Sequence, residues 1–169
     1  MKLRPATKID ASNIAEVHVA SWRYAFKGIM QQDILDNLSV QESAKRWEGI
    51  LEQNTGKVFV SEHGGLISGF VNARKYRYDD IVKPLPGEIA SIYLAPQFIG
   101  QGVGARLLQR GIAYLESEGL SDVAAWVLQA NAAAITFYNA FGFDPDGASK
   151  IHRKSGLVAL RYIRHGNNA

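Results

Sequence analysis

The chain has 169 residues, of which 47% are hydrophobic and 21% are charged, and its formal net charge is +3. This length allows a chain to bury roughly 70% of its unfolded surface, so we expect one domain spanning residues 1–169. The sequence contains no cysteine, which excludes disulfide frameworks, thiolate nucleophiles and thiolate metal sites. The positive charge is small and scattered, and it does not indicate a nucleic acid partner.

The first residues lack the apolar core of a signal peptide, and no apolar run approaches the ~20 residues that cross a bilayer. We therefore expect a cytoplasmic protein with no membrane partner. The four histidines are scattered and have no partners at metal-ligand spacing, so no metal is expected: His18, His63, His152 and His165.

The N-terminal part predicts a strand followed by two helices. A short strand over residues 3–5 precedes a helix with Asp10 or Ser12 at its N-cap. The spacing of Ser39 and Glu42 is that of a capping box, and the helix that it starts should stop before Gly56.

The middle of the chain predicts an antiparallel hairpin, because two apolar runs, 58–61 and 66–71, flank His63-Gly-Gly65. A polar, aromatic-rich loop over 74–87 then leads to a strand over 88–94.

The C-terminal half predicts a strand, helix, strand unit, which forms a right-handed parallel crossover. A helix runs to about Glu118, a strand covers residues 123–128, and a second helix begins at Asn131. A terminal strand over 157–163 completes a mixed α/β fold.

Three glycines at alternate positions, Gly100, Gly102 and Gly104, lie between the strand over 88–94 and the following helix. Glycine allows a tight turn and a close approach to the backbone, and the helix N-terminus presents unpaired N–H groups. The turn therefore predicts an anion site, most simply for phosphate.

The same glycines also fit the dinucleotide-binding fingerprint of a nicotinamide or flavin enzyme. That fingerprint needs an acidic residue after the second strand, but the residues from Val127 to Asn131 include none. A P-loop is excluded because no Lys-Ser or Lys-Thr pair follows the glycines.

Two segments together resemble motifs of the GNAT superfamily of acyl-CoA-dependent N-acetyltransferases. Residues 96–108 resemble its pyrophosphate loop, and residues 131–143 resemble its second conserved motif. The opening residues 3–10 are also similar to the family's first strand and helix. Ile99 departs from the pattern, because the family usually has Arg or Gln there.

The resemblance implies a mixed central sheet flanked by helices. Its N-terminal strands would be antiparallel, its central parallel pair splayed, and its C-terminal strands antiparallel. The implied reaction moves an acetyl group from acetyl-CoA to an amine of a small molecule or peptide, by direct attack in a ternary complex. A non-catalytic acyl-CoA-binding or sensing module is the alternative.

The resemblance also assigns the residues that would bind acetyl-CoA. Backbone N–H groups of the turn would hold the pyrophosphate, strand main chain would pair with the pantetheine arm, and Asn131 would bond to that arm. The residues of the turn are Gly100, Gln101, Gly102, Val103, Gly104 and Ala105, and those of the strand are Ile92, Tyr93 and Leu94.

Tyr138 is expected to be the general acid for the departing thiolate, although a core aromatic residue would also fit its position. Glu88 is the leading candidate for the general base, against a solvated carboxylate or a water chain. The resemblance places the acceptor beside Trp22, Tyr24, Phe26, Tyr76 and Asp79, with Arg23, Arg77 and Tyr78 nearby. Asp79 and Asp80 suggest a polyamine or aminoglycoside acceptor. A homodimer through the last strands is possible in such a sheet.

Overall fold

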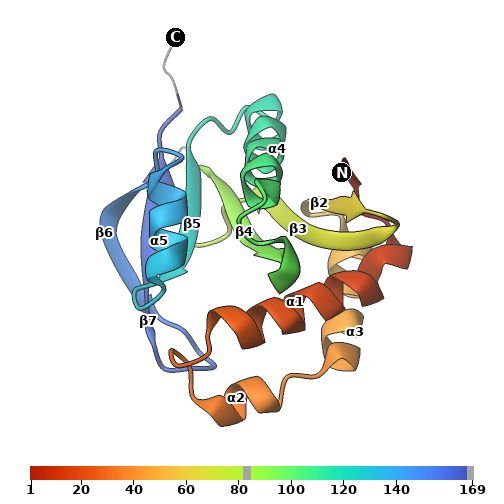
Figure 1. Ribbon diagram of the computed structural model, residues 1–169. Coiled ribbons are helices and arrows are strands. Elements are labelled where there is room, and N and C mark those ends of the chain that lie inside the picture. Colours follow the sequence, from red (N-terminus) through yellow and green to blue (C-terminus); the bar gives the residue numbers. More distant parts are fainter. Residues whose placement is uncertain (82–84, 167–169) are drawn as a thin grey trace.

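The computed structural model describes residues 1–81 and 85–166, and these form a seven-stranded sheet in the order β1-β2-β3-β4-β5-β7-β6 (Figure 1). The strands are β1 (Lys2–Pro5), β2 (Gly56–His63), β3 (Leu66–Lys75), β4 (Gly87–Leu94), β5 (Val123–Leu128), β6 (Asp144–Ile151) and β7 (Val158–Arg164). The helices are α1 (Ala11–Ala25), α2 (Gln32–Asp36), α3 (Val40–Gln53), α4 (Val103–Ser117) and α5 (Ala132–Asn139), with short 3-10 turns η1 (Lys8–Asp10) and η2 (Pro96–Phe98). The expected mixed sheet is confirmed: β4 and β5 are parallel, and the other neighbouring strands are antiparallel.

Helices cover both faces of the sheet because successive strand residues point to opposite sides. Val58 and Phe70 belong to a core cluster with Ile14 of α1 and Trp47 of α3. Their neighbours Phe59 and Val71 belong to a second cluster, which α4 completes with Leu107 and Leu108 and α5 with Tyr138. The sheet is therefore packed between α1 and α3 on one face and α4 and α5 on the other.

Local signals in the sequence explain several element boundaries. Ser39 caps α3 by accepting a hydrogen bond from the Glu42 N–H at 3.2 Å. Gly64 and Gly65 both have positive φ, 57° and 82°, as a two-residue hairpin turn requires. Asp10, rather than Ser12, occupies the N-cap of α1.

Two elements in the structure were not expected from the sequence. Strand β6 contains Pro145 and Gly147, and its pairing with β7 is irregular between Pro145 and Ser149. Most of its residues are exposed, so it lacks the apolar alternation that identifies a strand. Helix α2 has five residues, too few for a helical period to be recognisable.

The central parallel strands separate soon after they begin. β4 pairs with β5 only through Gly87 with Val123 and Glu88 with Ala124. On its other side, β4 has a register shift against β3 that leaves Ala90 as an extra residue. A bulge bends a strand and increases its twist, which explains why β4 turns away from β5. Beyond Glu88, the edge of β4 that faces β5 has no strand partner among the described residues.

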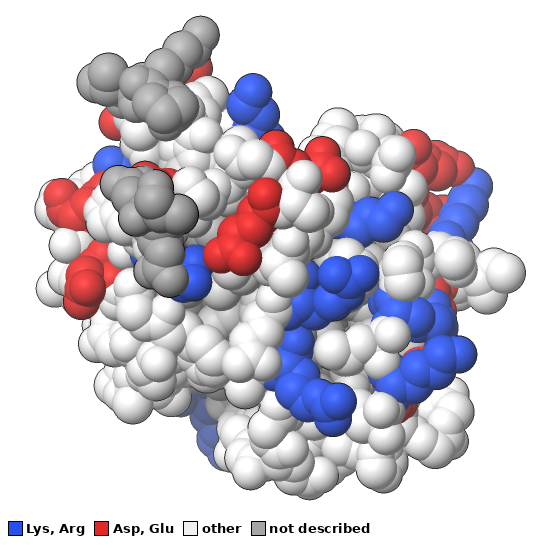
Figure 2. All heavy atoms as spheres, turned by 90° about the horizontal axis from the view of Figure 1, so that it is seen from above, with Lys and Arg blue, Asp and Glu red and all other residues white. Residues whose placement is uncertain are grey.

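The charge of the surface is unevenly distributed. Lys and Arg side chains gather on the right half of the face shown in Figure 2, whereas Asp and Glu lie to the left and along the upper rim. In the described ranges, none of the helices has both the length and the apolar character needed to span a bilayer.

Candidate active site

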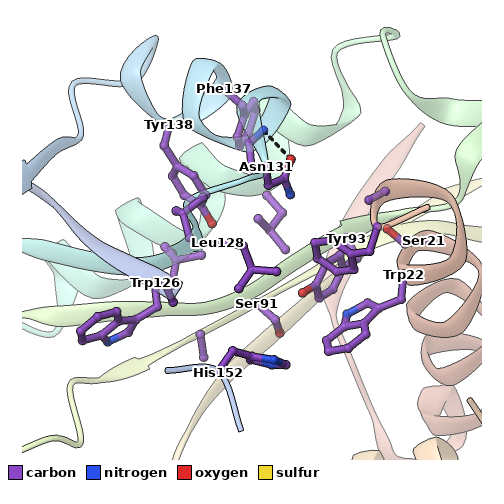
Figure 3. A pocket seen from close by; sticks show the side chains of 18 of the residues that line it. Ser21, Trp22, Ser91, Tyr93, Trp126, Leu128, Asn131, Phe137, Tyr138 and His152 are labelled. Carbon is purple, nitrogen blue, oxygen red and sulfur yellow. Dashed lines mark hydrogen bonds between the residues drawn. The ribbon is translucent and has the colours of Figure 1, made fainter. Parts of the chain in front are cut away.

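A cavity of about 500 Å³ lies where β4 and β5 diverge (Figure 3). Its volume is within the range of sites for small molecules and cofactors. Residues of α1, β3, β4, α4, β5, α5, β6 and β7 line it, together with residues of the segments that follow α1, β3, η2, β5 and β6. A single ligand in this cavity would therefore contact parts of the chain that are far apart in sequence.

The diverging part of β4 forms one wall of the cavity. Ala90 and Ser91 line it, together with three residues expected from the sequence to bind a cofactor, Ile92, Tyr93 and Leu94. Because this edge of β4 is not covered by β5, its backbone is accessible to an extended ligand that carries amide groups.

The glycine turn lies at one end of the cavity. Gly100 and Gly102 have φ of 79° and 76°, a left-handed conformation that glycine adopts without strain. Of the turn residues expected to bind phosphate, only Gly104 lines the cavity itself, and Ile99 lies beside it. The others form the turn behind Gly104: Gly100, Gln101, Gly102, Val103 and Ala105.

Helix α4 begins at Val103, and its first N–H groups have no partner within the helix. No acceptor in the described part of the chain takes the N–H groups of Val103, Gly104 or Ala105, whereas that of Arg106 bonds to the Gly102 carbonyl at 3.3 Å. The side-chain amide of Gln101 donates a hydrogen bond to the Gln97 carbonyl at 2.7 Å. The turn therefore presents free backbone donors, and its nearest side chain, Ile99, contributes none.

Asn131 lies at the cavity wall and also caps α5. Its Oδ1 accepts a hydrogen bond from the Ala134 N–H at 3.1 Å (Figure 3). Its Nδ2 amide forms no hydrogen bond with any described residue, so two donors are left for a ligand.

Tyr138 reaches the cavity from α5, and only 6% of its surface is exposed. Its ring packs edge-on against Phe137 and Phe143. Its hydroxyl has no hydrogen-bond partner among the residues described, and Figure 3 shows it directed toward the cavity interior. Burial, reinforced by the nearby Tyr93 and Glu88, raises the pKa of Tyr138 above that of a free tyrosine. The phenol is thus protonated at neutral pH.

Tyr93 lies across the cavity from Tyr138 and stacks on His18 with ring centroids 5.1 Å apart. Burial raises the pKa of Tyr93 to about 12. The Nε1–H groups of two tryptophans in the cavity wall, Trp22 and Trp126, are buried with no acceptor among the described residues.

Glu88 also lines the cavity, and it is not the solvated carboxylate that a strand end suggests. It is 3% exposed and accepts a hydrogen bond from Arg74 Nε at 2.9 Å. Arg74 lines the same wall, so the negative charge of Glu88 is balanced inside the site.

Two of the five expected acceptor residues, Trp22 and Phe26, line the cavity. Tyr24 does not line the cavity, and it is 61% exposed. Trp22 and Phe26 are four residues apart and therefore point to the same side, whereas Tyr24 between them points to another. Tyr76 is 2% exposed and is held by Asp80 and Arg161, at 2.9 and 3.0 Å, outside the cavity lining.

Asp79 is exposed and also lies outside the cavity lining. Asp80 pairs with Arg161 at 3.0 Å instead of facing the cavity. The two acidic residues that suggested a polyamine or aminoglycoside are thus not part of the cavity wall.

Several cavity residues were missed in the sequence. Lys150 and His152 belong to β6 and the turn after it, which lack a strand pattern, and Trp126 and Phe137 were interpreted only as parts of a strand and a helix. The continuous apolar run of β5 contains no alternation that could have marked Trp126, which is half-buried between buried neighbours, as a cavity residue.

Comparisons with known proteins agree with this geometry. A model of the Acetyltransferase (GNAT) family matches residues 16–143. The chain belongs to this family. The uncharacterized N-acetyltransferase YuaI of Bacillus subtilis is 32% identical over 165 residues, which cover 97% of this chain and 91% of that protein. The expected class, an acyl-CoA-dependent N-acetyltransferase, is confirmed.

Solved structures share the fold of this acetyltransferase. PaiA N-acetyltransferase of Thermoplasma acidophilum, in complex with coenzyme A, has a TM-score of 0.76 at 17% identity and covers 97% of this chain and 98% of its own. YncA of Salmonella typhimurium, a putative acetyltransferase with its cofactor acetyl-CoA, has a TM-score of 0.73 at 22% identity, with coverage of 100% and 95%.

Proposed function

We propose that this protein, as one acetyltransferase domain, transfers an acetyl group from acetyl-CoA to an amine of a small molecule or peptide by direct attack in a ternary complex. The observation that carries the proposal is the cavity between the diverging strands. It extends from Gly104 at the start of α4 to Trp126 on β5, and Tyr138 lies in its wall. Both substrates would therefore meet inside one cavity.

Acetyl-CoA binding would depend mainly on backbone groups. The free N–H groups at the start of α4 suit the pyrophosphate, because a helix N-terminus attracts anions. The unpaired edge of β4 suits the two amides of pantetheine, which would add to the sheet like a short strand. The Nδ2 amide of Asn131 can donate to the same arm. Two structures with this fold hold coenzyme A or acetyl-CoA, which supports this assignment.

A thioester is already activated, so the protein must position the amine, polarise the carbonyl and protonate the leaving group. An ammonium substrate would first lose a proton through water to the region of Glu88. The amine nitrogen then attacks the carbonyl carbon, whose oxygen is stabilised by a main-chain N–H near Tyr93 or Leu94. When the C–S bond breaks, the sulfur leaves with the electron pair and receives a proton from Tyr138. The acetylated nitrogen loses its extra proton, and the phenol is reprotonated from solvent.

The role of Tyr138 is tested by the variant Tyr138→Phe, which keeps the ring packing and removes the acidic proton. We expect thiol release from acetyl-CoA to fall by about tenfold or more, with coenzyme A affinity by calorimetry unchanged. Tyr114→Phe on α4, outside the cavity lining, is the matched control. Turnover that is equal in Tyr138→Phe and wild type would rule out this role.

The alternative, a non-catalytic sensor of acyl-CoA, predicts a different result. Such a protein would bind acetyl-CoA tightly and release no thiol with any amine in a panel of polyamines, aminoglycosides, amino acids and peptides. Thiol release above the hydrolytic background with any one of them would exclude the sensor.

A further inference from the structure

The end of the cavity remote from the glycine turn contains a group of cationic side chains around one phenol. Lys150 Nζ donates to the Tyr78 hydroxyl at 3.1 Å, and Arg77 Nη2 donates to the same oxygen at 3.3 Å. All three residues line the cavity. Two cationic groups thus donate to one neutral phenol oxygen. Cationic donors form stronger hydrogen bonds with an anionic oxygen, such as that of a carboxylate.

Neither cation has a carboxylate partner among the described residues. Lys150 lies over the rings of Tyr78 and Trp126, 4.1 Å from each centroid, and is half-buried there. An ammonium has three donors and a guanidinium five, and within the described ranges each of the two side chains donates one hydrogen bond, although Arg77 is exposed to solvent. The two hydrogen bonds lower the pKa of Tyr78 in spite of its burial, which by itself would raise that pKa.

The charges in the cavity wall do not cancel. Glu88 is the one acidic residue among those that line it in the described ranges, and Arg74 already balances it. Arg77 and Lys150 therefore give the lining of this end a net positive charge, whereas Asp80 and Asp146, which share Arg161, lie outside that lining. His152 adds no charge at pH 7, because burial and the neighbouring Lys150 and Lys154 lower its pKa. A cationic polyamine would be repelled at this end, whereas a negatively charged group would be attracted.

We propose that the acceptor amine also carries a carboxylate, which binds between Arg77 and Lys150 against the Tyr78 hydroxyl. This inference rests on the proposed acetyl transfer and names the acceptor class. Trp22, Phe26 and Trp126 also line the cavity and provide apolar ring surface, with the Trp22 and Phe26 rings edge-on to each other. The acceptor is therefore a small amino acid with an apolar or aromatic side chain, and not a polyamine.

The test compares three acceptors that differ only at the carboxylate: phenylalanine, phenylalaninamide and phenethylamine, with spermidine as a cationic reference. We expect kcat/KM for phenylalanine to exceed that of either matched compound by at least about tenfold. Lys150→Met should raise the KM for phenylalanine about tenfold and leave the KM for acetyl-CoA unchanged. Lys45→Met, on the exposed face of α3, is the control and should change neither value.

Turnover that favours spermidine or phenethylamine would overturn the inference and leave the proposed function intact. A Lys150→Met variant that affects acid and amide alike would also overturn it. If no amine causes thiol release, the proposed function is wrong. The carboxylate site is then tested separately by a binding measurement. With coenzyme A present, tryptophan fluorescence should report N-acetylphenylalanine binding at least about tenfold more tightly than its amide, and equal affinities would refute the site.

Discussion

The side chain of Asn131 divides its polar atoms between two tasks. Its oxygen caps α5 through the Ala134 N–H, which the sequence position before an apolar helix already indicates. Its nitrogen has no partner among the described residues, and the residue lines the cavity in which the proposed pantetheine arm lies. Because the two tasks use different atoms, substitution can separate them.

Asn131→Asp keeps an oxygen for the cap and removes the amide donors. We expect its unfolding free energy to stay within about 0.5 kcal/mol of wild type, while the KM for acetyl-CoA rises about tenfold. Asn131→Ala should lose the cap as well, at a cost of about 1 kcal/mol in denaturant unfolding. An Asn131→Asp variant with unchanged KM would show that the side chain only caps the helix.

His18 is enclosed by aromatic rings and by Trp47, whose Nε1–H is 3.2 Å from His18 Nδ1. Burial, assisted by Arg46 and Lys154, lowers the pKa of His18 from its ordinary value of 6.5 to about 4. The folded protein therefore favours the neutral imidazole. Between pH 6.5 and pH 4 the unfolded chain binds a proton that the folded chain does not.

The contribution of His18 to stability is accordingly complete above pH 6.5 and is lost as the pH falls to about 4. The loss reaches about 3 kcal/mol, because one pKa unit corresponds to about 1.4 kcal/mol. Urea unfolding of wild type and His18→Gln across this window should show the pH dependence shrink in the variant. The control His63→Gln, exposed at the hairpin, should match wild type. Parallel curves for His18→Gln and wild type would contradict this account.

Helix α4 contains two glycines with different surroundings. A Cβ at Gly104 would be 3.4 Å from Leu94 Cδ1 and 3.5 Å from Phe137 Cε2, which are ordinary contacts. A Cβ at Gly111 would be 3.1 Å from Ile89 Cδ1 and 3.2 Å from Val71 Cγ2, inside the packed core. Gly104 therefore leaves space at the cavity, and Gly111 allows α4 to pack closely against the sheet.

Gly104→Ala should retain wild-type stability or gain up to about 1 kcal/mol from helix propensity, and lose coenzyme A affinity by about tenfold or more. Gly111→Ala should lose about 1–3 kcal/mol from overpacking and bind coenzyme A normally when folded. Calorimetry and thermal unfolding of both variants measure the two effects. Wild-type coenzyme A affinity in Gly104→Ala would show that this glycine is not needed for cofactor binding.

At the scale of elements, the sequence predicts what local patterns encode. The cap of α3 and the glycine hairpin follow from capping and turn chemistry, and the strand Val123–Leu128 follows from a continuous apolar run. Strand β6 does not, because it is held by pairing with β7 and has no buried alternating face of its own. The cavity residues Lys150 and His152 were missed for this reason.

At the scale of the molecule, the sheet consists of two halves that are joined by two residue pairs between β4 and β5, Gly87 with Val123 and Glu88 with Ala124. A ligand that contacts both strands would connect these halves. Acetyl-CoA at 100 times its dissociation constant should stabilise the fold by about 2.7 kcal/mol. For a chain of this size, that corresponds to a rise in Tm of about 5–10 °C. Thermal unfolding with acetyl-CoA and with NAD measures this directly. A rise with NAD alone would favour a dinucleotide enzyme and contradict the proposed function.

The sequence by itself determined the family, the order of most strands and helices, and the glycine turn, because these depend on local spacing and on two contiguous motifs. The tertiary structure decided which side chains share the cavity. The bulge at Ala90 opens the sheet beside β5, an effect of pairing with β3 that no local pattern encodes. The charge at the end of the cavity remote from the glycine turn also depends on tertiary contacts. Asp80 and Asp146 both pair with Arg161 outside the cavity lining, while Lys150 reaches Tyr78 from a position 72 residues away in the sequence. Electrostatic character depends on which charges meet in space, so only the folded chain could show that this end is positive.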